Sequence, residues 1–92
     1  MEADIITRFI DDEGRITVWP SKSRHKEIVI SYLAGKFQKG HPYIEKEVNE
    51  VIKQWHTFTD WPLLRRELVD RGYLNRDRGG YEYRLTDKSV DE

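Results

Sequence analysis

Arginine is the residue type whose positions best suit a chemical role, and most of the arginines lie in the second half of the chain. The guanidinium group presents a planar fork of N–H donors that matches the paired acceptors of a phosphate or of a guanine edge. Duplex DNA is therefore the first candidate ligand. The expected DNA-contacting residues are Arg65, Arg66, Arg76, Arg78 and Arg84, with further phosphate contacts from Lys22, Arg24 and Lys26.

Acidic residues in the same segment weaken this hypothesis. Residues 60–84 hold six Arg and five Asp or Glu, and the whole chain has a formal net charge of -1. DNA-binding proteins commonly carry an excess of Lys and Arg, because neutralising phosphates supplies much of the affinity. Arg66 and Asp70 are spaced to pair on a helix, and Arg65 can equally be held by Glu45, Glu47 or Asp60 as a structural pair. DNA binding must therefore depend on a local patch.

Apolar residues outside the expected core support a second hypothesis, a protein-interaction or dimerisation module without direct DNA binding. Leu63 is predicted to point away from the helix face that is buried, and Trp19 and Phe58 could extend an apolar patch. The partner would be a second copy of the chain or another regulatory protein. A domain of this size that binds a palindromic site would need to dimerise in any case. The same side chains can instead complete the core.

Catalysis and metal binding have little support. Glu45 and Glu47 are two positions apart, so their side chains diverge on a helix and cannot form a paired-carboxylate site. His25, His41 and His56 lack the spacing of metal ligands, and the chain has no Cys to join them. We expect no enzyme, no metal site and no cofactor, while a ligand pocket among the aromatic residues stays open.

The composition is that of one small folded domain. The chain has 92 residues, of which 37% are hydrophobic and 12% aromatic, enough for one core and not for two. No apolar run approaches the ~18–20 residues needed to cross a bilayer. The start of the sequence lacks the basic and apolar segments of a signal peptide. We expect a cytoplasmic protein with no membrane contact.

The elements that must position the arginines follow from hydrophobic spacing. Residues 1–14 predict a short amphipathic helix or arm, and the alternation over Arg15–Trp19 predicts a strand. A helix is expected over Arg24–Phe37, and a second helix has one apolar stripe formed by Ile44, Val48, Val51, Ile52 and Trp55.

The last elements have the clearest boundaries. Thr59 or Asp60 can cap a helix that carries Pro62 in its first turn and ends at Arg71, before Gly72. Two strands within Tyr73–Leu85 flank a glycine-containing turn, and residues 86–92 form a polar tail that is expected to fray. Three helices followed by a hairpin predict an α+β fold, and in that order they are typical of a small winged helix. We expect this domain to cover residues 15–85, with its helical core and wing between Ser23 and Leu85. An open α+β domain with the same elements packed differently is the alternative.

Several runs also carry a family resemblance. They are Phe9, Gly14-Arg15, Trp19–Lys22, Phe37, Tyr43–Glu50, Asp60, Leu64–Asp70, Gly72, Leu74, Arg76, Gly80, Tyr81 and Arg84. These residues resemble a bacterial family of uncharacterised domains that occur alone or attached to transcriptional regulators with helix-turn-helix heads. The resemblance implies a regulatory setting and defines no activity.

One position departs from that family. Where this chain has Ile44, the family usually has Thr or Ser. That Thr or Ser forms a capping box with the Glu three residues later. Ile44 cannot accept a hydrogen bond, a loss of ~1 kcal/mol at this helix start. We therefore expect the helix to begin later or to use another cap, with Ile44 joining the apolar stripe.

Overall fold

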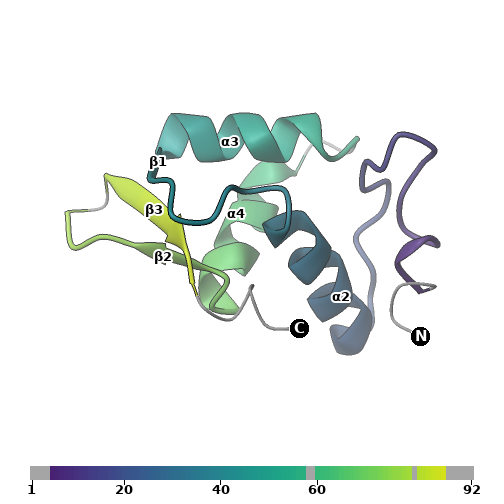
Figure 1. Ribbon diagram of the computed structural model, residues 1–92. Coiled ribbons are helices and arrows are strands. Elements are labelled where there is room, and N and C mark those ends of the chain that lie inside the picture. Colours follow the sequence, from purple (N-terminus) through teal and green to yellow (C-terminus); the bar gives the residue numbers. More distant parts are fainter. Residues whose placement is uncertain (1–4, 58–59, 80, 87–92) are drawn as a thin grey trace.

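The computed structural model describes residues 5–57, 60–79 and 81–86 of the chain. Within these residues three helices and a three-stranded antiparallel sheet form a small α+β fold (Figure 1). The elements in chain order are α2 (Ser23–Ala34), β1 (Tyr43–Ile44), α3 (Glu45–Gln54), α4 (Trp61–Asp70), β2 (Leu74–Arg76) and β3 (Glu82–Leu85). The α+β class expected from the sequence is confirmed.

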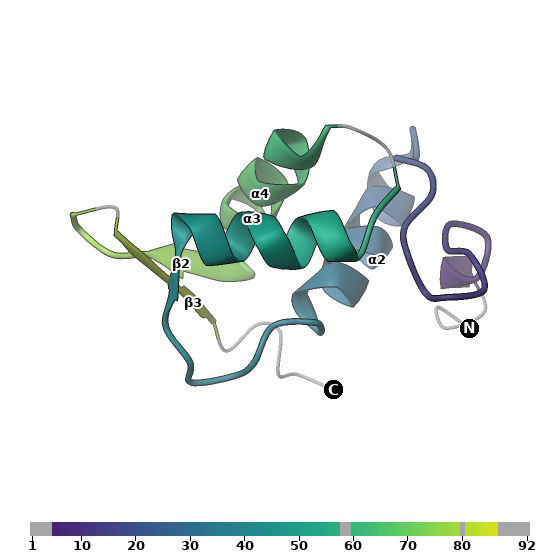
Figure 2. The same ribbon diagram turned by 90° about the horizontal axis from the view of Figure 1, so that it is seen from above.

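The sheet has the spatial order β1, β3, β2, so the last strand of the chain lies in the middle. Tyr83 of β3 is the cross-strand partner of Tyr43 in β1 and of Arg76 in β2. The β2–β3 hairpin extends away from the helices in both views (Figures 1 and 2). The predicted hairpin is confirmed, while the two-residue strand β1 was not predicted.

The core lies where the three helices meet the sheet. Its fully buried side chains include Leu33 of α2, Ile52 of α3, Leu68 of α4 and Tyr83 of β3. Burying one such aliphatic or aromatic side chain stabilises the fold by about 1.5–3 kcal/mol. This packing fixes the orientation of α4 against α3 and the hairpin.

Local signals explain why α4 begins and ends where it does. The Asp60 carboxylate accepts a hydrogen bond from the backbone N–H of Leu63 at 3.3 Å, and Pro62 lies in the first turn. Gly72 follows the helix with a φ of +88°, a left-handed conformation that residues with a side chain rarely adopt. The predicted helix is confirmed to within a residue at each end.

The start of α3 differs from the expectation. The Glu47 carboxylate accepts a hydrogen bond from the backbone N–H of Ile44 at 3.0 Å, so half of a capping box is present. Ile44 pairs with Glu82 in the sheet and its side chain is 49% exposed. The prediction that Ile44 joins the apolar stripe is wrong, because its backbone is extended and turns the side chain away from the helix face.

The predicted strand over residues 15–19 is also wrong. Ile16 instead forms two isolated bridges, one to Ile10 and one to His56. Its N–H donates to the Trp55 carbonyl at 2.8 Å, and the N–H of Thr57 donates to its carbonyl at 2.9 Å. Ile16 is fully buried by these contacts. The alternation in the sequence therefore marks one core residue between exposed neighbours, without a regular strand.

The end of α2 also differs from the prediction, and the N-terminal segment is described only in part. In the described part of the N-terminal segment, Ile5 and Ile6 are helical and a bent arm follows, while residues 1–4 of the expected helix or arm lie outside the described residues. The first helix ends at Ala34, and Phe37, expected inside it, is buried beyond its end. Residues 87–92 of the predicted tail lie outside the described residues. No helix among those described is long and apolar enough to cross a membrane.

Candidate nucleic-acid interface

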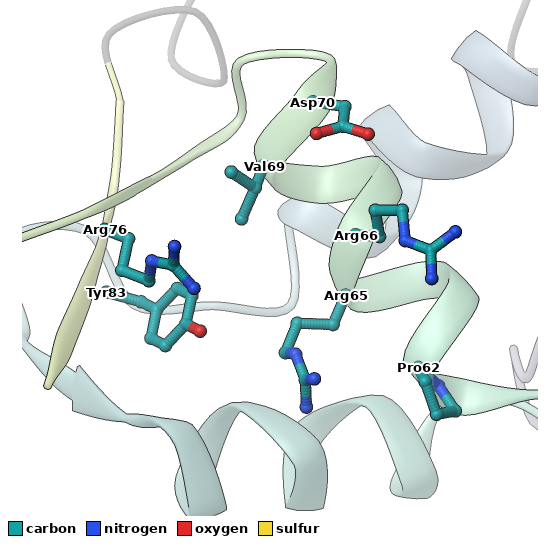
Figure 3. A pocket seen from close by; sticks show the side chains of 7 residues that line it. All are labelled: Pro62, Arg65, Arg66, Val69, Asp70, Arg76 and Tyr83. Carbon is teal, nitrogen blue, oxygen red and sulfur yellow. The ribbon is translucent and has the colours of Figure 1, made fainter. Parts of the chain in front are cut away.

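A polar pocket lies between α4 and the hairpin, above α3 (Figure 3). Its volume is about 300 Å³. The lining residues are Pro62, Arg65, Arg66, Val69 and Asp70 of α4, Arg76 of β2 and Tyr83 of β3. Three of the eight residues predicted to contact DNA therefore share one pocket. Tyr83 was missed by sequence reasoning, because its position depends on strand register.

Helical geometry explains how α4 contributes to this pocket. Leu64 and Leu68 are fully buried, which fixes the inner face of the helix. At ~100° per residue, Arg66 then lies opposite them, with Arg65 at the boundary. Arg76 reaches the same pocket from the sheet, because it is the cross-strand partner of Tyr83 and lies on the same sheet face.

Arg65 is held by α3. Its Nη1 donates to Asn49 Oδ1 at 2.7 Å and lies 3.5 Å from Glu45 Oε2. The guanidinium carbon is 5.6 Å from the centre of the Trp61 ring, and the side chain is 25% exposed. The sequence-based alternative, in which Glu45 pairs with Arg65, is confirmed. The Arg65–Glu45 pair adds little net charge to the pocket.

Arg66 and Arg76 differ from Arg65. Both are exposed, and neither forms an ion pair or hydrogen bond with any residue that the structure describes. In particular, the pairing of Arg66 with Asp70 that the sequence allowed is not formed in this structure. In Figure 3 the Arg66 guanidinium points outward from α4, and Asp70 lies at the far end of the pocket from Arg65. Two cations are thus left available to a ligand.

Glu67, the other carboxylate on α4, is turned away from this pocket. Its Oε1 accepts a hydrogen bond from Arg71 Nε at 2.6 Å. Arg71 also donates to Glu27 of α2 at 3.0 Å, and Tyr73 donates to the same carboxylate. The hydrogen bond to Glu67 raises the pKa of Arg71, while burial acts in the opposite direction. Burial, followed by the hydrogen bond to Glu27, raises the pKa of Tyr73 to about 12.

Asp77 is likewise used inside the hairpin. Its Oδ1 accepts the backbone N–H of Tyr81 at 2.8 Å and that of Glu82 at 3.3 Å. These bonds close the turn and orient the carboxylate toward the backbone. Arg78 in the same turn is exposed and has no ion pair within the described residues, and the Tyr81 side chain is 76% exposed.

The remaining predicted cations lie elsewhere. Arg84 opposes Asn75 across the hairpin, on the sheet face opposite to Arg76, and its Nη2 lies 3.5 Å from Glu82. The start of α2, which carries Lys22, Arg24 and Lys26, lies away from the hairpin in both views (Figures 1 and 2). The structure therefore separates these four residues from the pocket.

The two described residues of those predicted for a protein interface, Trp19 and Leu63, are both half-buried and form no exposed apolar patch. Trp19 packs against the core, with the Lys26 ammonium 5.7 Å from its ring centre. Phe58 lies outside the described residues. The described large apolar side chains that are exposed are Val18, Ile44 and Tyr81. The part of the chain that the structure describes contains no cluster of His, Asp or Glu suited to a metal ion.

A family model described as an uncharacterized protein conserved in bacteria (DUF2087) matches residues 15–85. The chain belongs to this family. No curated protein and no solved structure matches it. The DUF2087 match contains all the named helices and strands and every residue of the pocket, and it excludes the N-terminal arm through Gly14.

Proposed function

We propose that this DUF2087 protein binds duplex DNA and acts as a transcriptional regulator, with α4 in the major groove and the β2–β3 hairpin along the phosphate backbone. The order of elements supports this proposal. Three helices, a short strand after the first helix and a C-terminal hairpin that pairs with it are in the order expected of a winged helix, and the proposal takes α4 as the third helix of that fold. With 10 residues, α4 is ~15 Å long, and its diameter with side chains, ~10–12 Å, fits a major groove that is ~12 Å wide.

The observation that carries the proposal is the pairing state of the charged groups. Arg66 and Arg76 line one exposed pocket and have no ion-pair partner among the described residues, and Arg78 is equally unpaired in the adjacent turn. Glu67 and Asp77 are both bonded elsewhere. Glu67, which is paired with Arg71, therefore cancels less of this positive charge than the sequence suggests, whereas Asp77 keeps its charge because its partners are neutral N–H groups.

Each arginine has a distinct proposed role. Arg66 points outward from the middle of α4, where its donor fork can meet the O6 and N7 acceptors of guanine. Arg76 and Arg78 belong to the hairpin and are assigned to phosphates, which position the protein without specifying sequence. Arg65 is held by Asn49 and Glu45 through Nη1 at the inner side of this surface, and its other N–H donors are left on the pocket side of α4 for contacts with the DNA backbone.

The overall charge sets limits on the binding strength. With a formal net charge of -1 the chain gains no general attraction to DNA. Asp70 at the edge of the pocket also repels phosphate. The proposal therefore implies weak binding to arbitrary sequences that is best measured at low salt, with tight binding reserved for a sequence that Arg66 recognises.

The test is a fluorescence anisotropy titration of a labelled mixed-sequence duplex at about 50 mM salt, where phosphate contacts contribute most. The double variant Arg66→Gln/Arg76→Gln should lower the affinity by about tenfold or more. The matched control is Arg84→Gln, on the same hairpin but the opposite sheet face, which should change the affinity by less than about twofold. Undetectable binding of the unmodified protein would refute the proposal, as would equal losses in the double variant and the control.

A further inference from the structure

The recess between α4 and the sheet has the features of a site for one phosphate group. We propose that a single phosphoryl group binds there between Arg76 and Arg65, with Arg66 at the rim. This inference deepens the proposed function. It rests on that function only where it identifies the bound phosphate as part of the DNA backbone. A phosphodiester of duplex DNA and a free phosphate or phosphorylated small molecule offer the same chemistry.

The two guanidinium groups approach the recess from different elements. Arg76 comes from β2 and Arg65 from α4, with the Val69 and Tyr83 side chains also lining the space (Figure 3). Guanidinium groups bind phosphate oxygens through short, charge-assisted hydrogen bonds that are about twice as strong as neutral ones. Two forks supplied by two elements can contact different oxygens of one phosphate.

Arg65 keeps donors for this role although α3 holds it. Its hydrogen bond to Asn49 and its ion pair with Glu45 both use Nη1. A guanidinium has five N–H donors, and no residue in the described part of the chain accepts from Nε or Nη2 of Arg65. The contacts to α3 therefore preorganise the fork, which lowers the entropy lost on binding.

The environment strengthens these interactions. Val69 is half-buried and Tyr83 is only 1% exposed, so the Val69 side chain and the Tyr83 ring present apolar surface beside the charged groups. Charge-assisted bonds are stronger next to such surface than in open water. The Tyr83 hydroxyl donates to Glu45 Oε1 at 3.5 Å, so the carboxylate that pairs with Arg65 is also fixed from the sheet. Asp70, the one carboxylate in the lining, is five positions beyond Arg65, a rise of ~7.5 Å along the helix.

The size of the recess is also suitable. Its volume of about 300 Å³ equals the share of roughly ten molecules in liquid water. This space accommodates one phosphate with part of its hydration shell. The recess also differs from the opposite face of the sheet in the pairing of its cations. Arg84, on that opposite face, is already paired with Glu82.

The test is an NMR titration of the full chain with inorganic phosphate, observing the side-chain Nε–H signals of arginine. Sodium chloride at matched ionic strength gives the background response. We expect saturable shifts at Arg65 and Arg76 and none beyond background at Arg84. Arg76→Gln should weaken phosphate binding by at least about tenfold, and Arg84→Gln by less than twofold. Amide signals of each variant verify that it is folded.

Addition of unlabelled duplex then distinguishes the sources. Displacement of phosphate from Arg76 by the duplex identifies the DNA backbone as the natural occupant. Phosphate binding that the duplex does not affect supports the site with a free phosphate or phosphorylated small molecule as its ligand. Shifts spread evenly over all arginines and unchanged by Arg76→Gln would overturn the inference. If the duplex still binds in that case, the DNA-binding proposal survives without the phosphate site.

Discussion

Replacing Arg76 by Gln should make DNA binding both weaker and less sensitive to salt. Arg76 and Arg78 are the two hairpin cations that have no ion-pair partner in the described part of the chain, whereas Arg65 is compensated by Glu45 and Arg84 lies 3.5 Å from Glu82. Each neutralised phosphate contributes about −0.9 to the slope of log affinity against log salt, because it releases bound counterions. Two phosphate contacts therefore predict a slope of about −1.8, and the variant one of about −0.9.

These slopes give measurable differences. Between about 50 and 200 mM salt the affinity of the unmodified protein should fall about 12-fold, and that of the Arg76→Gln variant about 3.5-fold. Arg66→Gln should weaken binding while keeping a slope near that of the unmodified protein, since Arg66 is assigned to a base edge. Arg84→Gln is the control, because it removes one positive charge from the hairpin without removing a proposed phosphate contact.

The assay is fluorescence anisotropy on one duplex at four or more salt concentrations, with unfolding curves to verify that each variant is folded. An Arg76→Gln slope equal to that of the unmodified protein would refute the assignment of Arg76 to a phosphate. An equal reduction in Arg84→Gln would show that the hairpin acts through overall charge, contrary to the separation of the two arginines onto opposite sheet faces.

Three further predictions concern the fold that supports this surface. Leu68→Ala should lower the free energy of unfolding by about 2–5 kcal/mol in urea titrations, because Leu68 is fully buried; a loss below 1 kcal/mol would contradict the core assignment. Ile44→Thr should raise the stability by up to about 1 kcal/mol by completing the cap with Glu47, and an unchanged melting temperature would argue against it. The pKa of Tyr73 is raised to about 12, so the fold favours the neutral phenol, and its contribution is complete below pH ~10 and is lost as the pH rises toward 12. Tyr73→Phe should therefore reduce the loss of stability over that interval, and identical pH profiles for the two proteins would exclude this linkage.

Local sequence signals predicted α4 well because each of them acts within a few residues. Asp60, Pro62 and Gly72 define its start and end through hydrogen bonding, ring geometry and backbone conformation. The prediction of a strand over residues 15–19 was wrong, because alternating polar and apolar residues indicate which side chains are buried and do not show whether the backbone is hydrogen-bonded to another strand. Ile16 is buried by bonds to residues around His56, about 40 positions later, and no local pattern contains that partner.

The candidate site was predictable on the helix and not on the sheet. Helical periodicity placed Arg66 outward and Arg65 at the boundary, as observed. The two hairpin arginines could not be assigned to faces, because a shift of register by one residue exchanges the faces of a strand. The observed pairing of Arg76 with Tyr83 puts Arg76 on the pocket side and Arg84 on the other. The same register places the Tyr83 side chain on the pocket side of the sheet.

The charge arrangement around α4 is the basis of the proposed binding surface. Exposed ion pairs contribute at most about 1 kcal/mol, so leaving Arg66 and Arg76 unpaired costs the fold little, even with Asp70 on the same helix. Glu67 instead pairs with Arg71, which joins α4 to α2 through Glu27 and stabilises the orientation of the helix. The carboxylates thus serve the fold, while the two unpaired guanidinium groups remain at the surface between α4 and the hairpin. Under our proposal these two groups bind an anionic ligand at this position, which the salt dependence of the Arg76→Gln variant tests.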